Sequence, residues 1–129
     1  MAEEKEKDIN VVIENAMNNE EEWILLSKFL KSKYMTEVST FHNYNIKYQN
    51  EKDASKRKEL GDRMIVKFLT LDGDATLPDH PGCYRDIKRK LKRLKNNDYP
   101  SDLFINAHDK CVFSLSTIWD EFLASKEKK

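Results

Sequence analysis

Residues 23–48 read WILLSKFLKSKYMTEVSTFHNYNIKY, and this stretch decides the fold. In its first part the apolar side chains recur at helical spacing and form one stripe, made of Leu25, Leu26, Phe29 and Leu30. In its second part four residues follow at i, i+3, i+7 and i+10, namely Val38, Phe41, Asn45 and Tyr48. We therefore predict two helices joined by a tight corner, with partner helices that cover both stripes. The corner is polar and has neither glycine nor proline, so it is the first place to look for function.

The segments on both sides of this stretch also have helical periodicity. Asp8 is a predicted N-cap for an amphipathic helix whose apolar positions are Ile9, Val12, Ile13, Ala16 and Met17. Asn19 followed by Glu22 resembles a capping box at the start of the helix that carries the first stripe. After the corner, the helix is expected to run from about Thr36 to about Asp53 and to be followed by a charged bend at residues 51–59.

In the second half of the chain, the sequence pattern predicts further helices and one long loop. The next stripe begins at Leu60, and residues 70–82 form the one long loop, rich in glycine and proline. A basic helix follows over residues 84–94, and then a helix that Ser101 can cap and a last short helix from Ile118. No stretch alternates with period two, so we predict an all-α fold of seven or eight helices. We expect a charged lead-in at residues 1–8, one domain at 9–126 and a polar tail at 127–129.

Composition narrows the class of protein. Of the 129 residues 39% are hydrophobic and 36% are charged, and 23 basic and 23 acidic side chains give a net charge of +0. This neutral balance argues against a dedicated nucleic-acid binder. No apolar run is long enough to span a bilayer, and the charged N-terminus lacks the apolar run of a signal peptide. We expect a cytoplasmic monomer in which Cys83 and Cys111 are reduced.

Residue spacing gives little support for catalysis or metal binding. No nucleophile elbow, phosphate loop or dinucleotide fingerprint is present. The pairs His80-x-x-Cys83 and His108-x-x-Cys111 could supply four zinc ligands, but neither has a common zinc-finger spacing. Residues 72–74, Asp-Gly-Asp, lack the distal glutamate of a calcium loop and predict a plain turn. We predict no metal and no cofactor.

The run from residue 85 to residue 95 holds seven basic side chains and one acid, Asp86. Its candidate contacts to an anionic surface are Arg85, Lys88, Arg89, Lys92 and Arg93. Such a run could bind anionic lipid head groups, at the inner face of the plasma membrane, or nucleic acid. A solvated helix face is the simpler interpretation, because the apolar heptad beneath the charges already explains the helix. Between the two partners, the neutral net charge favours the membrane.

Two groups of residues carry a family resemblance. They are Phe29-Leu30-Lys31-Ser32, Tyr34, Glu37 and Phe41 in the first half, and Pro100, Asp102-Leu103-Phe104, Ala107 and Phe122-Leu123-Ala124-Ser125 in the second. Their order resembles the regulator of G-protein signalling (RGS) domain over residues 9–126. The resemblance implies an RGS-like bundle of about nine helices that binds the GTP-bound α subunit (Gα) of a heterotrimeric G protein. Such a domain positions the switch segments of Gα and accelerates GTP hydrolysis, with no active site of its own.

The resemblance also implies where Gα would bind. The expected contacts lie at the corner, in the long loop and at the turn into the last helix; they are Tyr34, Met35, Glu37, Val38, Leu77, Asp79, Thr117 and Glu121. Val38 and Leu77 stand where the family has asparagines, and Glu121 stands where it has an arginine.

Two functional hypotheses follow. In the first, the chain is an RGS domain that activates a GTPase. In the second, it is a scaffold or membrane-docking module of the same fold that uses the basic helix and does not accelerate hydrolysis.

Overall fold

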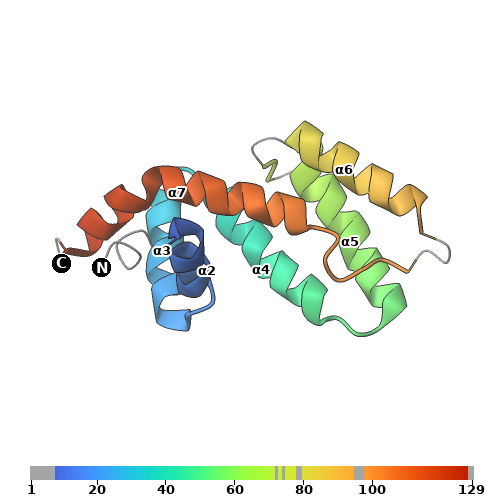
Figure 1. Ribbon diagram of the computed structural model, residues 1–129, viewed down its shortest axis with the longest axis horizontal. Coiled ribbons are helices and arrows are strands. Elements are labelled where there is room, and N and C mark those ends of the chain that lie inside the picture. Colours follow the sequence, from blue (N-terminus) through green and yellow to red (C-terminus); the bar gives the residue numbers. More distant parts are fainter. Residues whose placement is uncertain (1–7, 72, 74, 78–79, 95–97, 128–129) are drawn as a thin grey trace. The chain divides into compact units, whose positions relative to one another are not determined.

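The computed structural model describes residues 8–71, 73, 75–77, 80–94 and 98–127 (Figure 1). These residues form six helices and no strand, which confirms the all-α prediction. The helices are α2 (Ile9–Met17), α3 (Glu20–Ser32), α4 (Thr36–Asn50), α5 (Ala54–Leu69), α6 (His80–Lys92) and α7 (Ile105–Glu127). The expectation of about nine helices is therefore wrong for the described part of the chain.

Side-chain caps set the start of three helices. The Asp8 carboxylate accepts a hydrogen bond from the Asn10 N–H (2.9 Å), and the Asn19 side chain accepts one from the Glu22 N–H (3.0 Å). Both caps were predicted from the sequence. Asp53 caps α5 in the same way, through the Lys56 N–H (3.1 Å). Because of this cap, α5 begins at Ala54, and the charged bend predicted for residues 51–59 shrinks to residues 51–53.

Helix α7 differs most from its prediction. A short last helix was expected after a turn at residues 116–118, but Ile105–Glu127 is one continuous helix. The Ser116 hydroxyl donates to the Phe113 carbonyl (2.5 Å), and the Thr117 hydroxyl donates to the Ser114 carbonyl (2.7 Å). Both hydroxyls thus bond within the helix and do not break it. The buried residues of α7 also continue without interruption through this point, at positions 107, 111, 112, 115, 119 and 122.

The described residues divide into two compact units. The first unit combines the chain up to Thr36 with the chain from Cys111 onward, and the second holds the residues between them. In the first unit α2 packs against α3, with Ile13, Leu26 and Leu30 fully buried. The ring of Phe122, on α7, contacts Phe29 (centroids 5.4 Å apart) and Trp119 (5.1 Å). Phe29 was predicted to be buried, but it is only half-buried.

An aromatic cluster forms the core of the second unit. The ring of Phe41, on α4, contacts Phe68 on α5 (5.2 Å) and Phe104 just before α7 (6.2 Å). Tyr48, two turns further along α4, contacts Phe104 edge-on (5.0 Å). All four positions of the second predicted stripe are buried, which confirms the periodicity argument for α4. Helix α6 covers α5 and contributes Cys83 and Ile87 to the buried residues.

No helix among the described residues is long and apolar enough to cross a membrane.

Candidate functional site

The corner after α3 is a hydrogen-bonded helix end. The Met35 N–H donates to the Leu30 carbonyl (2.8 Å), and the Tyr34 N–H donates to the Lys31 carbonyl (3.2 Å). These two bonds satisfy carbonyl groups that the last turn of a helix otherwise leaves free, in the arrangement of a Schellman motif. The motif requires a left-handed residue after the helix cap, and Tyr34 adopts this conformation with φ 59°.

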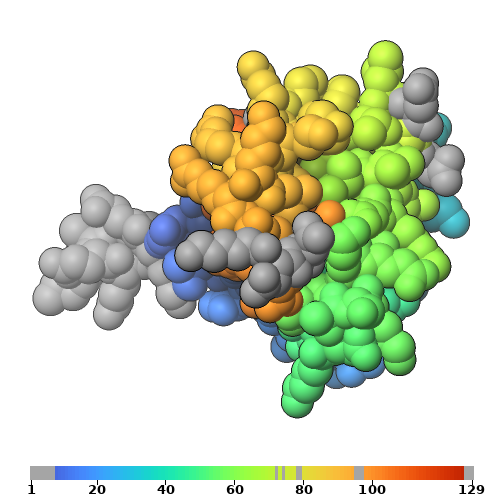
Figure 2. All heavy atoms as spheres, turned by 90° about the vertical axis from the view of Figure 1, so that its right-hand side faces the viewer, coloured from blue at the N-terminus to red at the C-terminus, as the bar shows by residue number. Residues whose placement is uncertain are grey.

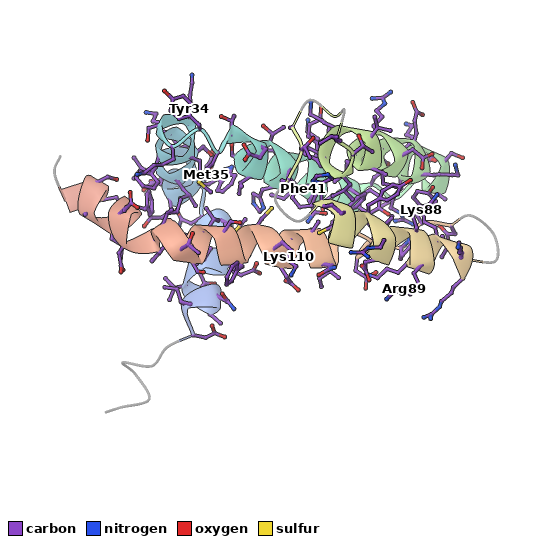
Figure 3. The ribbon with its side chains drawn as sticks, turned by 90° about the horizontal axis from the view of Figure 1, so that it is seen from above. Tyr34, Met35, Phe41, Lys88, Arg89 and Lys110 are labelled. Atoms are coloured by element: carbon purple, nitrogen blue, oxygen red, sulfur yellow. The ribbon has the colours of Figure 1, made fainter. Side chains whose placement is uncertain are left out.

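Tyr34 is an unusual residue for this position. Glycine normally takes it, because a Cβ in the left-handed region costs about 1–2 kcal/mol. The Tyr34 side chain is 92% exposed, so packing within the chain does not offset that cost. Figure 3 shows Tyr34 at the end of α3. A large, exposed ring held in a strained conformation suggests that another molecule binds it.

An ion pair joins this corner to α7 within the first unit. Lys33, the residue before Tyr34, pairs with Glu121, and the Lys33 ammonium also lies 5.8 Å from the centre of the Phe29 ring. Two of the predicted contact regions, the corner and the Thr117–Glu121 region, are thereby held to each other. Thr117 is exposed one turn before Glu121, inside α7 and not in a turn. Met35 is half-buried.

Glu37 and Val38 begin α4 in the second unit. Glu37 is partly exposed in the first turn of the helix, where the helix dipole favours a negative charge. Val38 has an exposed fraction of 0%. The side chain of Val38, which the resemblance placed among the contacts, is therefore packed in the core.

The loop after α5 folds back over the end of that helix. The Leu77 N–H donates to the Phe68 carbonyl (2.8 Å), and the Thr76 hydroxyl donates to the Thr70 carbonyl (2.7 Å). Leu77 is only 2% exposed, because its side chain anchors the loop in the core. The side chain of Leu77, a further contact expected from the resemblance, is therefore packed within the protein as well. The predicted contact Asp79 lies outside the described residues, and α6 begins at His80, earlier than predicted.

The basic residues of α6 are exposed. Arg85, Lys88, Arg89, Lys92 and Arg93 all reach the surface of the second unit. Helix α6 ends at Lys92, two residues earlier than the sequence pattern predicted, so Arg93 and Leu94 follow the helix.

No group of three or more metal-ligating side chains lies together among the described residues. Cys83 and Cys111 are both buried and free of disulfides. The paired His-x-x-Cys motifs therefore do not form a four-ligand zinc site within the described chain.

Two features of the site were not predicted from the sequence. One is the left-handed conformation of Tyr34; the absence of glycine where a helix ends and the chain turns is the signal that could have found it. The other is the pair between Lys33 and Glu121, which lie 88 positions apart in the chain and which no local pattern connects.

Neither the protein-family models, nor the curated proteins, nor the solved structures compared with the chain gave a significant match.

Proposed function

We propose that this protein binds the GTP-bound α subunit of a heterotrimeric G protein and accelerates its GTP hydrolysis. The observation that carries the proposal is the exposed, left-handed Tyr34 at the corner where the RGS resemblance expects the partner to bind. Aromatic residues at the centre of protein interfaces often supply much of the binding energy. Glu37, partly exposed three residues later, offers a carboxylate for backbone or side-chain donors of the partner.

The packing of the aromatic residues supports the resemblance on which this proposal rests. Phe29 and Phe122, from the two halves of the resemblance, contact each other in the first unit. Phe41 and Phe104, also from the two halves, contact each other in the second. The residues that carry the resemblance thus meet as packed pairs, as expected for positions that determine a fold.

On this proposal the protein contributes position and not chemistry. GTP hydrolysis depends on a correctly oriented water molecule and on charge stabilisation at the phosphate. The residues that provide both belong to the GTPase. A bound domain that holds the switch segments in their reactive arrangement lowers the barrier by removing the entropy of alternative arrangements.

A second candidate function is binding without acceleration. Val38 and Leu77 are buried where the RGS family offers amide side chains, and α7 runs straight through the position of the expected turn. Fewer polar groups are then available to hold the switch segments, so a complex could form without reaching the hydrolytic arrangement.

The test is single-turnover GTP hydrolysis by a panel of Gα subunits, together with binding to Gα in a transition-state-mimic form. The parent protein should bind at least one Gα and increase its hydrolysis rate. Binding without a higher rate would establish the second candidate. If no Gα binds, the proposal is wrong.

Tyr34→Gly separates loss of contact from loss of fold. Glycine removes the left-handed strain but adds chain entropy to the unfolded state, so the free energy of unfolding should rise by about 0.5–1 kcal/mol. Binding to Gα should weaken by about 1–3 kcal/mol, because the exposed ring is gone. Glu37→Ala should weaken binding to a similar extent through an unpaired donor on the partner.

Val66→Ala serves as the control, because Val66 is 62% exposed on α5 outside the expected contact regions. It should leave both stability and binding near the parent values. If Tyr34→Gly and Glu37→Ala also bind Gα as tightly as the parent, the corner is not the contact surface.

A further inference from the structure

Five cations lie on one side of α6 and of the residue that follows it. Arg85, Lys88, Arg89, Lys92 and Arg93 fall at i, i+3, i+4, i+7 and i+8. At 100° per residue these positions cover an arc of about 140° and a length of about 12 Å along the helix axis. We call this set the α6 basic face.

The α6 basic face points away from the core. All five side chains are exposed, whereas Cys83 and Ile87 are each 1% exposed on the opposite side of the helix. Figure 2 shows atoms of α6 at the surface, and Figure 3 labels Lys88 and Arg89 on the helix. The buried face fixes the rotation of the helix, so the cations are presented together and not scattered.

Acidic side chains do not neutralise this face within the described part of the chain. The one acid of α6, Asp86, is half-buried beside the face and pairs with Lys90 (3.2 Å), which does not belong to the face. Lys88 lies over the ring of Tyr84 (5.5 Å), an arrangement that retains its charge. The chain as a whole carries a net charge of +0, so the positive charge of this face is a local concentration and not a general property of the protein.

We propose that the α6 basic face binds the surface of an anionic lipid bilayer. Charge complementarity supports this partner: a row of long, flexible cationic side chains along the outside of a helix matches a surface on which anionic head groups are mobile and repeated. Binding of single-stranded nucleic acid would call for exposed aromatic rings that stack on bases. The described part of the face has none, since Tyr84 lies off it and is half-buried. This inference is independent of the proposed binding to Gα.

The experiment is co-sedimentation of the full chain with two kinds of vesicle, phosphatidylcholine alone and phosphatidylcholine in which about a third of the lipid is phosphatidylserine. The protein should bind the anionic vesicles and not the neutral ones. Binding should weaken steeply as the salt concentration rises, because exposed charges are screened. Equal binding to both kinds of vesicle would overturn the proposal.

A matched pair of triple variants locates the binding surface. Lys88→Gln, Arg89→Gln and Lys92→Gln together should lower the affinity for anionic vesicles on the order of 100-fold, at about five-fold for each charge. Lys28→Gln, Lys31→Gln and Lys52→Gln together change three exposed lysines elsewhere and alter the net charge by the same amount. This control should change the affinity by no more than about five-fold.

Two further outcomes would contradict the inference. If both triple variants lose affinity equally, net charge and not the α6 basic face attracts the bilayer. An oligonucleotide, duplex or single-stranded, and additional anionic vesicles are each added as competitors. If the oligonucleotide releases the protein from the vesicles at a lower concentration than the competing anionic lipid does, the face binds nucleic acid. All variants should give the far-ultraviolet circular dichroism spectrum of the parent, because every substituted side chain is exposed.

Discussion

At the scale of single residues, Gly61 shows how tertiary packing reverses a local preference. Within α5 a glycine weakens the helix by about 1 kcal/mol relative to alanine, so the sequence alone predicts that Gly61 is destabilising. In the structure a Cβ at Gly61 would lie 2.9 Å from Cδ2 of Tyr99 and 3.1 Å from Cε1 of Tyr48. Neither ring can move freely. The Tyr99 hydroxyl donates to Asp62 (2.6 Å), and the Tyr48 hydroxyl donates to the Pro100 carbonyl (2.6 Å).

We therefore expect Gly61→Ala to destabilise the protein by about 1–3 kcal/mol, despite the better helix propensity of alanine. Urea unfolding of the parent and the variant measures this difference. In a Tyr99→Ala background the nearest ring is absent, so the same substitution should cost less. A rise in stability on Gly61→Ala in the parent would show that the two rings yield easily and that the close packing has little energetic weight.

At the scale of elements, α7 is one continuous helix that contributes residues to both units. Thr117 lies in its interior and is exposed, so it tests the backbone without disturbing the core. Thr117→Pro should lower the free energy of unfolding by about 3 kcal/mol or more, since proline lacks the N–H donor and clashes with the preceding turn. Thr117→Ala is the matched control and should be neutral or slightly stabilising. Equal urea midpoints for the two variants would instead indicate a turn at residues 116–118.

At the scale of the whole molecule, two buried tyrosines make stability depend on alkaline pH. Burial raises the pKa of Tyr99 to about 12, and the hydrogen bond to the Asp62 carboxylate adds to the shift. Burial also raises the pKa of Tyr48, well beyond the usual tyrosine range. Below about pH 10 both phenols are protonated in the folded and the unfolded chain, so their full contribution to stability is present. Above this pH the unfolded chain loses protons that the folded chain retains, so the free energy of unfolding falls as pH rises.

The urea midpoint of the parent should thus decrease between about pH 10 and pH 12. Tyr99→Phe should cost about 1 kcal/mol at neutral pH through the lost hydrogen bond, and should make the alkaline decrease shallower. Identical slopes for the parent and Tyr99→Phe would mean that Tyr99 does not hold its proton more tightly in the folded state.

The sequence by itself determined the features that depend on near neighbours in the chain. Asp8 and Asn19 cap helices because their side chains reach N–H groups two or three residues away, and this reach is a local property. The stripe from Val38 to Tyr48 is buried as its spacing predicted, because a 3.6-residue period places those side chains on one face whatever covers them. The basic face of α6 follows from the same geometry.

Only the tertiary structure decided which side chains are available to a partner. The resemblance placed Val38 and Leu77 among the contacts, but packing places both side chains in the core. For Val38 the helical spacing had already predicted burial, whereas no local pattern signals the burial of Leu77. The continuity of α7 could not be predicted because the hydroxyls of Ser116 and Thr117 can either end a helix or bond within it, and long-range burial of Leu115, Trp119 and Phe122 selects the helix. Likewise the left-handed Tyr34 and the pair of Lys33 with Glu121 depend on the path of the chain after α3 and on the approach of α7, which local sequence does not encode.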